Sequence, residues 1–235
     1  MEVYHERFGR DPKGLWPAEG AVWQEIVPLV HEAGYRWMAS GEDVLAKSLG
    51  IGSFNRDSAG VVRQADELYR PYYVETDDGK RVGMVFRDQR LSDLIGFEYS
   101  QTPGEQAATN FIGRIRAIKE RLKEQGSTGP HLVSVILDGE NAWENYPNDG
   151  KRFLHSLYEK LSEAEDIRTT TPSRYLETFP QQRTIDELWW GSWFSPDYGT
   201  WIGEEEENRA WEYLRRTRRM LAQYGVYDKK EASAE

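Results

Sequence analysis

The chain has 235 residues, and its 40 acidic side chains against 30 basic ones give a formal net charge of −10. A surface with this balance repels phosphate groups, so binding to nucleic acid or to an anionic membrane is not expected. The sequence contains no cysteine, which excludes disulfides, thiolate chemistry and cysteine-ligated zinc. No apolar run approaches the ~20 residues of a membrane helix, and the lack of an N-terminal targeting segment predicts a cytoplasmic protein.

Five segments, taken in chain order, predict strands. Residues 14–20 (G-L-W-P-A-E-G) are typical of the end of a strand, and short apolar runs follow at residues 34–39, 82–86, 131–137 and, more weakly, 168–171. The run at 131–137 is almost continuously apolar, as in a strand covered on both faces in a parallel sheet or barrel.

Three further segments carry apolar side chains at a spacing of three and four, which is the periodicity of a helix packed on one face. They span residues 108–122, 153–161 and 211–221. Strands that alternate with such helices predict an α/β fold, with chemistry expected just beyond the carboxyl ends of the strands.

Acidic and amide side chains gather after the run at 131–137, in the segment L-D-G-E-N-A-W-E. One interpretation is structural, because Asp138 can cap a helix whose first turn favours acids. Another makes Asp138 an acid or base in a pocket, with Trp143 beside it. A less favoured one is a Ca²⁺ or Mg²⁺ site made of Asp138, Glu140, Asn141 and Glu144, whose spacing splays the side chains apart.

The segment at 14–20 also has two interpretations. Pro17 can open a helix, which places Glu19 in its first turn for structural reasons. Alternatively, Trp16 and Glu19 set an apolar ring beside a carboxylate at a strand end. Two carboxylates from different strand ends among tryptophans are typical of a glycosidase site, where indole faces stack on sugar rings. The sequence has no G-x-S-x-G, P-loop, G-x-G-x-x-G or paired-histidine motif that would favour other chemistry.

Two other segments are candidates for ligand contact. Arg87 and Asp88 follow the strand at 82–86, and either a salt bridge or a ligand contact explains them equally well. Ser92 and Asp93 predict the start of a helix. Residues 189–203 hold four tryptophans among Gly, Ser, Pro and Asp without a helix or strand period, which favours a surface that stacks on sugars.

Four segments together resemble glycoside hydrolase family 57, most closely its amylopullulanase-like branch. They are G-L-W-P-A-E-G-A-V, F-R-D-Q-R-L-S-D-L-I-G-F, I-L-D-G-E-N-A-W-E-N-Y and G-S-W-F-S-P-D-Y-G-T-W-I-G-E-E-E-E-N-R-A-W, in this order over roughly residues 14–220. The resemblance implies a retaining enzyme that acts on α-glucans such as starch, glycogen or pullulan. It also implies an incomplete (β/α)7 barrel followed by a helical region.

The resemblance assigns roles to individual residues. It implies that Glu19 is the nucleophile and Asp138 the acid/base of a double displacement that needs no cofactor or metal. Positions near the sugar are then expected at Trp16, Arg87, Asp88, Trp143, Trp193 and Trp201.

The chain departs from the family in its first two motifs, since no His-Gln-Pro segment occurs. We therefore expect a partial barrel that lacks its first strands over residues 1–180, followed by the Trp-rich loop and a helical segment over residues 181–235. An upstream polypeptide that supplies the missing strands is an expected partner. The alternative is a non-catalytic remnant that still binds glycans.

Overall fold

The structure is a computed structural model that describes residues 2–139 and 143–223. It contains two compact units, Met1–Pro196 and Asp197–Glu235. The units divide after Pro196, whereas the sequence predicts a division after residue 180. No helix among the described residues is long and apolar enough to cross a bilayer.

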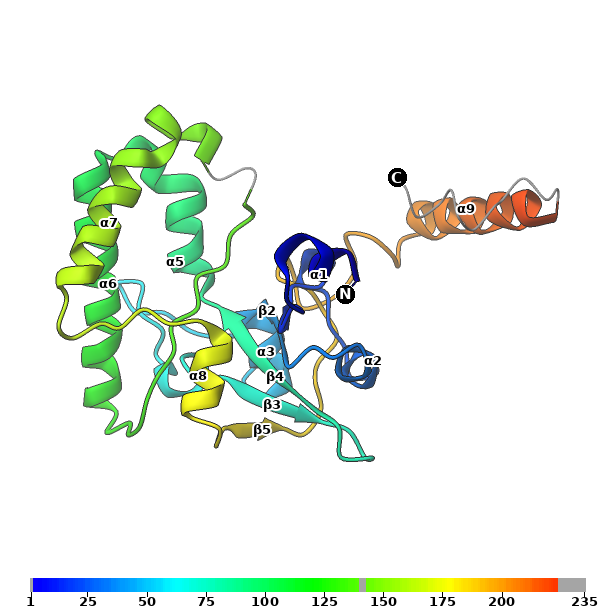
Figure 1. Cartoon of the computed structure of the whole chain (residues 1–235), viewed down its shortest axis with the longest axis horizontal. Coiled ribbons are helices and arrows are strands. Elements are labelled where there is room, and N and C mark those ends of the chain that lie inside the picture. Colours follow the sequence, from blue (N-terminus) through cyan, green and yellow to red (C-terminus); the bar gives the residue numbers. More distant parts are fainter. Residues whose placement is uncertain (1, 140–142, 224–235) are drawn as a thin grey trace. The chain divides into compact units, whose positions relative to one another are not determined.

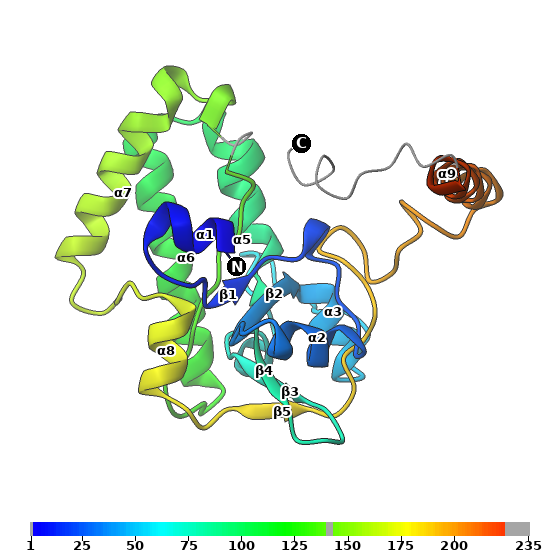
Figure 2. The same ribbon diagram turned by 45° about the vertical axis from the view of Figure 1, so that its right-hand side comes forward.

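The first unit is built on a five-stranded sheet with the order β1-β2-β4-β3-β5 (Figures 1 and 2). Strands β1, β2 and β4 run parallel, β3 is antiparallel to β4, and β5 is parallel to β3. The prediction of mixed α/β structure is confirmed. The strands are β1 (Gly14–Leu15), β2 (Trp37–Gly41), β3 (Tyr72–Glu75), β4 (Arg81–Arg87) and β5 (Arg183–Ile185).

The strands predicted at 34–39 and 82–86 correspond to β2 and β4, and β1 confirms the strand end at 14–20. The strand predicted at 131–137 is wrong: this segment is half-buried and makes one isolated parallel bridge, between Ser134 and Arg87. The reason is non-local. Because β3 pairs with β4 as far as Met84, the segment can reach β4 only beyond that residue.

The predicted strand at 168–171 is also wrong. Residues 168–170 are not in a strand, and Thr171 caps the following helix by accepting a hydrogen bond from the Arg174 amide at 3.2 Å. Strands β3 and β5 were not predicted. An Asp78-Gly79 turn between β3 and β4 is a hairpin signal that could have indicated β3.

Helices of the first unit lie around the sheet (Figures 1 and 2). The predicted helices at 108–122, 153–161 and 211–221 correspond to α6, α7 and α9, and α6 and α7 pack along each other (Figures 1 and 2). The helices and helical turns are α1 (Glu2–Phe8), η1 (Ala18–Gly20), α2 (Ile26–Glu32), α3 (Glu42–Ser48), α4 (Ala65–Leu68), α5 (Gln89–Asp93), η2 (Leu94–Glu98), η3 (Tyr99–Gln101), α6 (Gly104–Glu124), η4 (Trp143–Asn145), η5 (Pro147–Gly150), α7 (Lys151–Glu163), α8 (Pro172–Thr178) and α9 (Glu205–Gln223).

Local chemistry explains where α6 ends. Gly126 has a φ of 65°, a conformation that glycine adopts without cost. Its amide donates to the Lys123 carbonyl at 2.9 Å, and the Ser127 amide donates to the Leu122 carbonyl at 3.0 Å. This pair of bonds is a Schellman motif, which satisfies carbonyls that the helix end leaves free.

One apolar core joins the sheet to α6 and α7. It includes Met38 of β2, Met84 of β4, Phe111 of α6 and Phe153 of α7, all buried. The sheet is thereby fixed against the helix pair, so the loops at the carboxyl ends of β1, β2 and β4 start from a rigid base.

A partly buried ionic cluster forms around Asp66. The Asp66 carboxylate binds Arg70 at 2.6 Å, His131 at 2.8 Å and Arg183 at 2.5 Å. Burial raises the pKa of Asp66, but the hydrogen bonds from these three side chains outweigh it and hold the pKa well below its usual range. The cluster ties α4 and β5 to the segment that leads to Asp138.

Candidate active site

Glu19 lies on a tight turn directly after β1. Pro17 is not the first residue of a helix, as the structural interpretation of this segment has it; it precedes the single turn η1, within which Glu19 has φ 56° and ψ 22°. This left-handed conformation costs a side-chain-bearing residue ~1 kcal/mol or more, and such strain clusters at functional sites. The turn leaves the Glu19 side chain exposed at the carboxyl end of β1.

Trp193 holds Glu19 through two hydrogen bonds. Its indole Nε1 donates to Glu19 Oε2 at 3.1 Å, and its backbone amide donates to the Glu19 carbonyl, also at 3.1 Å. The Trp193 ring meets Trp16 edge to face, with centroids 5.0 Å apart. The structure therefore brings together three of the predicted site residues, although 174 positions separate Glu19 from Trp193.

Arg87 connects this group to the segment before Asp138. Its guanidinium lies 5.1 Å from the centre of the Trp193 ring, within the range of a cation–π contact. The buried Arg87 side chain also donates to the Ile136 carbonyl at 2.9 Å and to Asp93 at 2.6 Å. Arg87 is thus held between the Trp loop and residue 136.

Asp138 follows a segment that is anchored to β4 and α5. The Asp88 amide donates to the Ser134 carbonyl at 2.9 Å, and the Ile136 amide donates to Ser92 Oγ at 3.2 Å. Because the bridge at Ser134 is parallel to β4, the chain leaves in the direction in which β4 ends. The half-buried Asp138 therefore lies beyond the same end of the strands as Glu19 and Arg87.

Trp143 packs against the aromatic rings next to α7. Its ring lies 5.4 Å from Tyr146 and 6.4 Å from Phe153, and it is half-buried. Of the residues considered as metal ligands, Glu140 and Asn141 lie outside the described residues. Over residues 2–139 and 143–223, no group of three His, Asp or Glu side chains is placed to hold a metal ion.

Asp88 is buried and fully engaged with protein groups. It caps α5 by accepting from the Leu91 amide at 2.9 Å, so the helix begins at Gln89 and not at Ser92 and Asp93 as predicted. Its other oxygen accepts from the Tyr69 hydroxyl at 2.6 Å. These contacts correspond to the structural interpretation of Asp88, and a contact between Asp88 and sugar stays a prediction.

A buried acid that was not predicted from the sequence, Glu42, lies beside Asp88. Glu42 begins α3 directly after β2, accepts from Arg56 Nη2 at 2.6 and 2.5 Å, and accepts from the Gln89 amide at 2.8 Å. Burial raises the pKa of Glu42 to about 7, although Arg56 opposes the shift. The position of Glu42 shortly after a predicted strand could have indicated it as a site residue. Nothing in the sequence distinguishes Arg56.

The Trp-rich segment is divided between the two units. Trp189 and Trp190 stack with centroids 5.9 Å apart in the first unit. Trp201 belongs to the second unit, where its carbonyl accepts from the Trp211 indole at 2.7 Å. The structure thus groups Trp201 with Trp211 and groups Trp193 with Glu19.

Comparisons with known proteins show the family to which the chain belongs. The model of glycosyl hydrolase family 57 matches residues 1–187. A 4-alpha-glucanotransferase from Thermococcus litoralis is 28% identical over 186 residues, which cover 76% of this chain and 24% of that protein. An alpha-amylase from Pyrococcus abyssi is 26% identical with the same coverage. The chain spans about a quarter of the length of these curated relatives.

Three solved structures resemble the chain. The GH57-type branching enzyme from Pyrococcus horikoshii has a TM-score of 0.65 at 19% identity, covering 88% of this chain and 45% of that one. The alpha-amylase AmyC from Thermotoga maritima has a TM-score of 0.64 at 14% identity, covering 82% of this chain and 45% of that one. The 4-alpha-glucanotransferase from Thermococcus litoralis has a TM-score of 0.59 at 21% identity, covering 96% of this chain and 32% of that one. At these identities the likeness shows a shared fold.

Proposed function

Because the chain belongs to glycosyl hydrolase family 57, we propose that it contributes the catalytic carboxylates of a retaining enzyme acting on α-glucans. The relatives named above are a 4-alpha-glucanotransferase, alpha-amylases and a branching enzyme. The observation that carries the proposal is Glu19, a glutamate in a strained turn whose carboxylate and carbonyl are both held by Trp193.

The proposed reaction is a double displacement. Glu19 attacks the anomeric carbon while Asp138 protonates the departing glycosidic oxygen, which leaves a glycosyl group bound to Glu19. Asp138 then acts as a base on water or on an acceptor sugar, and the bond to Glu19 breaks. This chemistry requires the two carboxyl groups to approach to ~5–5.5 Å in the working site.

The surroundings of Glu19 support its role as nucleophile. The indole of Trp193 binds Oε2, so it orients the carboxylate while the attack proceeds through Oε1. The Trp16 and Trp193 rings supply apolar surface for sugar C–H faces. Arg87, held against Trp193, contributes a fixed positive charge next to this surface.

We further propose that the sheet is part of a (β/α)7-type barrel that other polypeptide completes. Strand β1 is an edge strand of two residues, and no described residue pairs with its outer edge. An unpaired parallel edge of this kind accepts a further strand. Polypeptide corresponding to upstream parts of the longer relatives would fill this position.

The nucleophile is tested by chemical rescue. Glu19→Gly removes the carboxylate and suits the left-handed backbone, so turnover of maltoheptaose falls by ~10⁴-fold or more while the fold is kept. Added azide then restores cleavage and gives a glycosyl azide of inverted configuration. Glu25→Gln is the matched control, because Glu25 is exposed, lies six residues away and makes no side-chain cap.

The acid/base role has its own signature. Asp138→Asn slows release of a natural sugar leaving group strongly, but slows an activated aryl glycoside much less, because the latter needs no protonation. Equal losses for both substrates would contradict the assignment. Retention is checked by NMR of the first anomer formed.

The alternative, a chain that binds glycans without cleaving them, makes a different prediction. It requires that the unmodified chain binds maltoheptaose while no turnover occurs, even when polypeptide supplying the remaining strands is added. Membership of the amylopullulanase-like branch predicts cleavage of pullulan as well as amylose, and an amylose-only product pattern would contradict that branch.

A further inference from the structure

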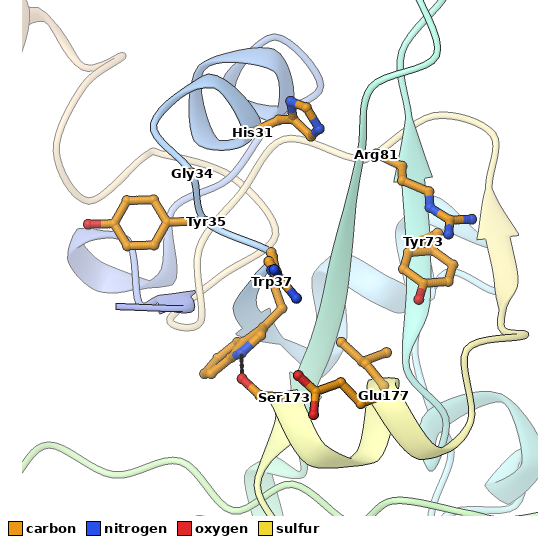
Figure 3. Close-up of a pocket in the computed structure, with 10 residues that line it drawn as sticks. His31, Gly34, Tyr35, Trp37, Tyr73, Arg81, Ser173 and Glu177 are labelled. Atoms are coloured by element: carbon orange, nitrogen blue, oxygen red, sulfur yellow. Dashed lines mark hydrogen bonds between the residues drawn. The ribbon is translucent and has the colours of Figure 1, made fainter. Parts of the chain in front are cut away.

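A pocket lies at the opposite end of the strands from Glu19. It encloses about 440 Å³ where β2 and β4 begin (Figure 3). This volume lies within the ~300–1,000 Å³ of typical ligand pockets. Since β4 has seven residues and a strand rises ~3.3 Å per residue, the two ends of the sheet are ~20 Å apart.

The pocket arises from a row of paired residues across the sheet. Gly83 of β4 pairs with Trp37 of β2 on one side and with Tyr73 of β3 on the other. The glycine therefore leaves a gap between two aromatic side chains on the same face. Leu176 of α8 lies over this gap, so close that a Cβ on Gly83 would be 2.8 Å from its Cδ1. Trp37 and Tyr73 thus form walls, and Leu176 closes the base.

The two rings are held in place before any ligand binds. The Trp37 indole donates to Ser173 Oγ at 2.9 Å, which fixes both the ring and α8 (Figure 3). The Arg81 guanidinium lies 4.5 Å from the centre of the Tyr73 ring. Rigid rings lower the entropy cost of binding a ligand between them.

Polar groups of the pocket remain available. Among the described residues, the side chains of His31, Arg36 and Glu177 make no hydrogen bond or ion pair. Figure 3 shows Arg81 beside Tyr73 and Glu177 near Ser173 and Trp37. The hollow around Asp66 is different, because three of its charged side chains, Asp66, Arg70 and Arg183, are already joined by ion pairs.

We propose that this pocket is a second, non-catalytic binding site for glucosyl units of an α-glucan. Fixed aromatic rings suit the C–H faces of a sugar, and a guanidinium with a carboxylate suits neighbouring hydroxyls. Charges of both signs favour a neutral polyhydroxylated ligand over an ion. The pocket has one acid among its lining residues, Glu177, and so lacks the pair of carboxylates that cleavage requires.

The identity of the sugar rests on the proposed function. A site ~20 Å from Glu19 would hold a distant part of a polymer while another part reaches the catalytic edge. The effective concentration of the polymer at Glu19 then rises, whereas a short substrate gains nothing.

The test measures binding of the whole chain to glycogen by gel retardation and to maltoheptaose by calorimetry. The double variant Arg81→Ala/Glu177→Ala removes exposed side chains and is expected to weaken glycogen binding by at least tenfold. Tyr73→Ala, with folding verified by circular dichroism, gives the same result through loss of a wall. Arg174→Ala is the matched control, since it removes an exposed cation from α8 that does not line the pocket.

The outcomes separate the pocket from the catalytic proposal. Weaker glycogen binding in the pocket variants, with binding by Trp193→Ala retained, supports the pocket even if the chain proves inactive. Unchanged glycogen binding in the pocket variants overturns it. So does an unmodified chain that binds neither glycogen nor maltoheptaose, or one that binds inorganic phosphate there instead.

Discussion

The close approach of Gly41 to the Trp loop provides a direct test of how the site is held. Gly41 ends β2, and a Cβ placed there would lie 2.7 Å from Trp193 Cα and 3.3 Å from the Ser192 carbonyl oxygen. Ordinary contact begins at 3.4 Å, so the backbone at Trp193 must move by about 0.7 Å. Gly41 itself has φ −81° and ψ 158°, which alanine adopts without strain.

The loop cannot move freely, because Gly191 exchanges two backbone hydrogen bonds with Val22 at 2.8 and 3.0 Å. We therefore expect Gly41→Ala to lower the free energy of unfolding by ~1–3 kcal/mol, the usual cost of overpacking. The same displacement lengthens both 3.1 Å bonds from Trp193 to Glu19 beyond hydrogen-bond range. A misplacement of this size costs up to ~10²-fold in turnover.

The measurement is urea denaturation followed by circular dichroism, together with turnover of maltoheptaose. Gly113→Ala is the control, since Gly113 lies on the exposed side of α6 with no atom within 4 Å of the added Cβ. Alanine there stabilises the helix by ~0.5–1 kcal/mol. The reasoning is refuted if Gly41→Ala is as stable and active as the unmodified chain, or if Gly113→Ala destabilises it equally.

Further substitutions test strain, charge and capping. Glu19→Gly should unfold at higher urea than Glu19→Gln, by ~1 kcal/mol, because glycine relieves the left-handed strain; equal midpoints would contradict strain. Asp66→Asn should lower the free energy of unfolding by ~1.5–3 kcal/mol at pH 7, the usual contribution of hydrogen bonds to a charged group; because the fold lowers the pKa of Asp66, this loss should shrink as pH falls through the acid range. In the unmodified chain the free energy of unfolding should fall as the pH rises from ~4.5 to about 7, because the raised pKa of Glu42 lets the native state hold a proton that the unfolded state has lost. Glu42→Gln should remove this fall, and an unchanged pH profile would contradict the reasoning. Thr171→Ala should lower the free energy of unfolding by ~1 kcal/mol through loss of the α8 cap, with the exposed Thr169→Ala as the neutral control in the same urea denaturation.

Local patterns determined the three long helices and the central strand. Periodic apolar side chains predict α6, α7 and α9 because a helix face must repeat every three or four residues whatever it packs against. The apolar run at 82–86 predicts β4, because a strand that is covered on both faces is apolar at consecutive positions. Trp16 and Glu19 could be chosen from the sequence, since they are near neighbours at a strand end.

Tertiary structure decided which segments pair and which side chains meet. The run at 131–137 has the composition of a buried strand, but the antiparallel β3 occupies the place beside β4 that it would need. The contacts of Trp193 with Glu19 and of Arg56 with Glu42 depend on loops brought together by the packed sheet. Pairing across the chain is fixed by competition for sheet edges and by close packing, and neither leaves a periodic signal in the residues themselves.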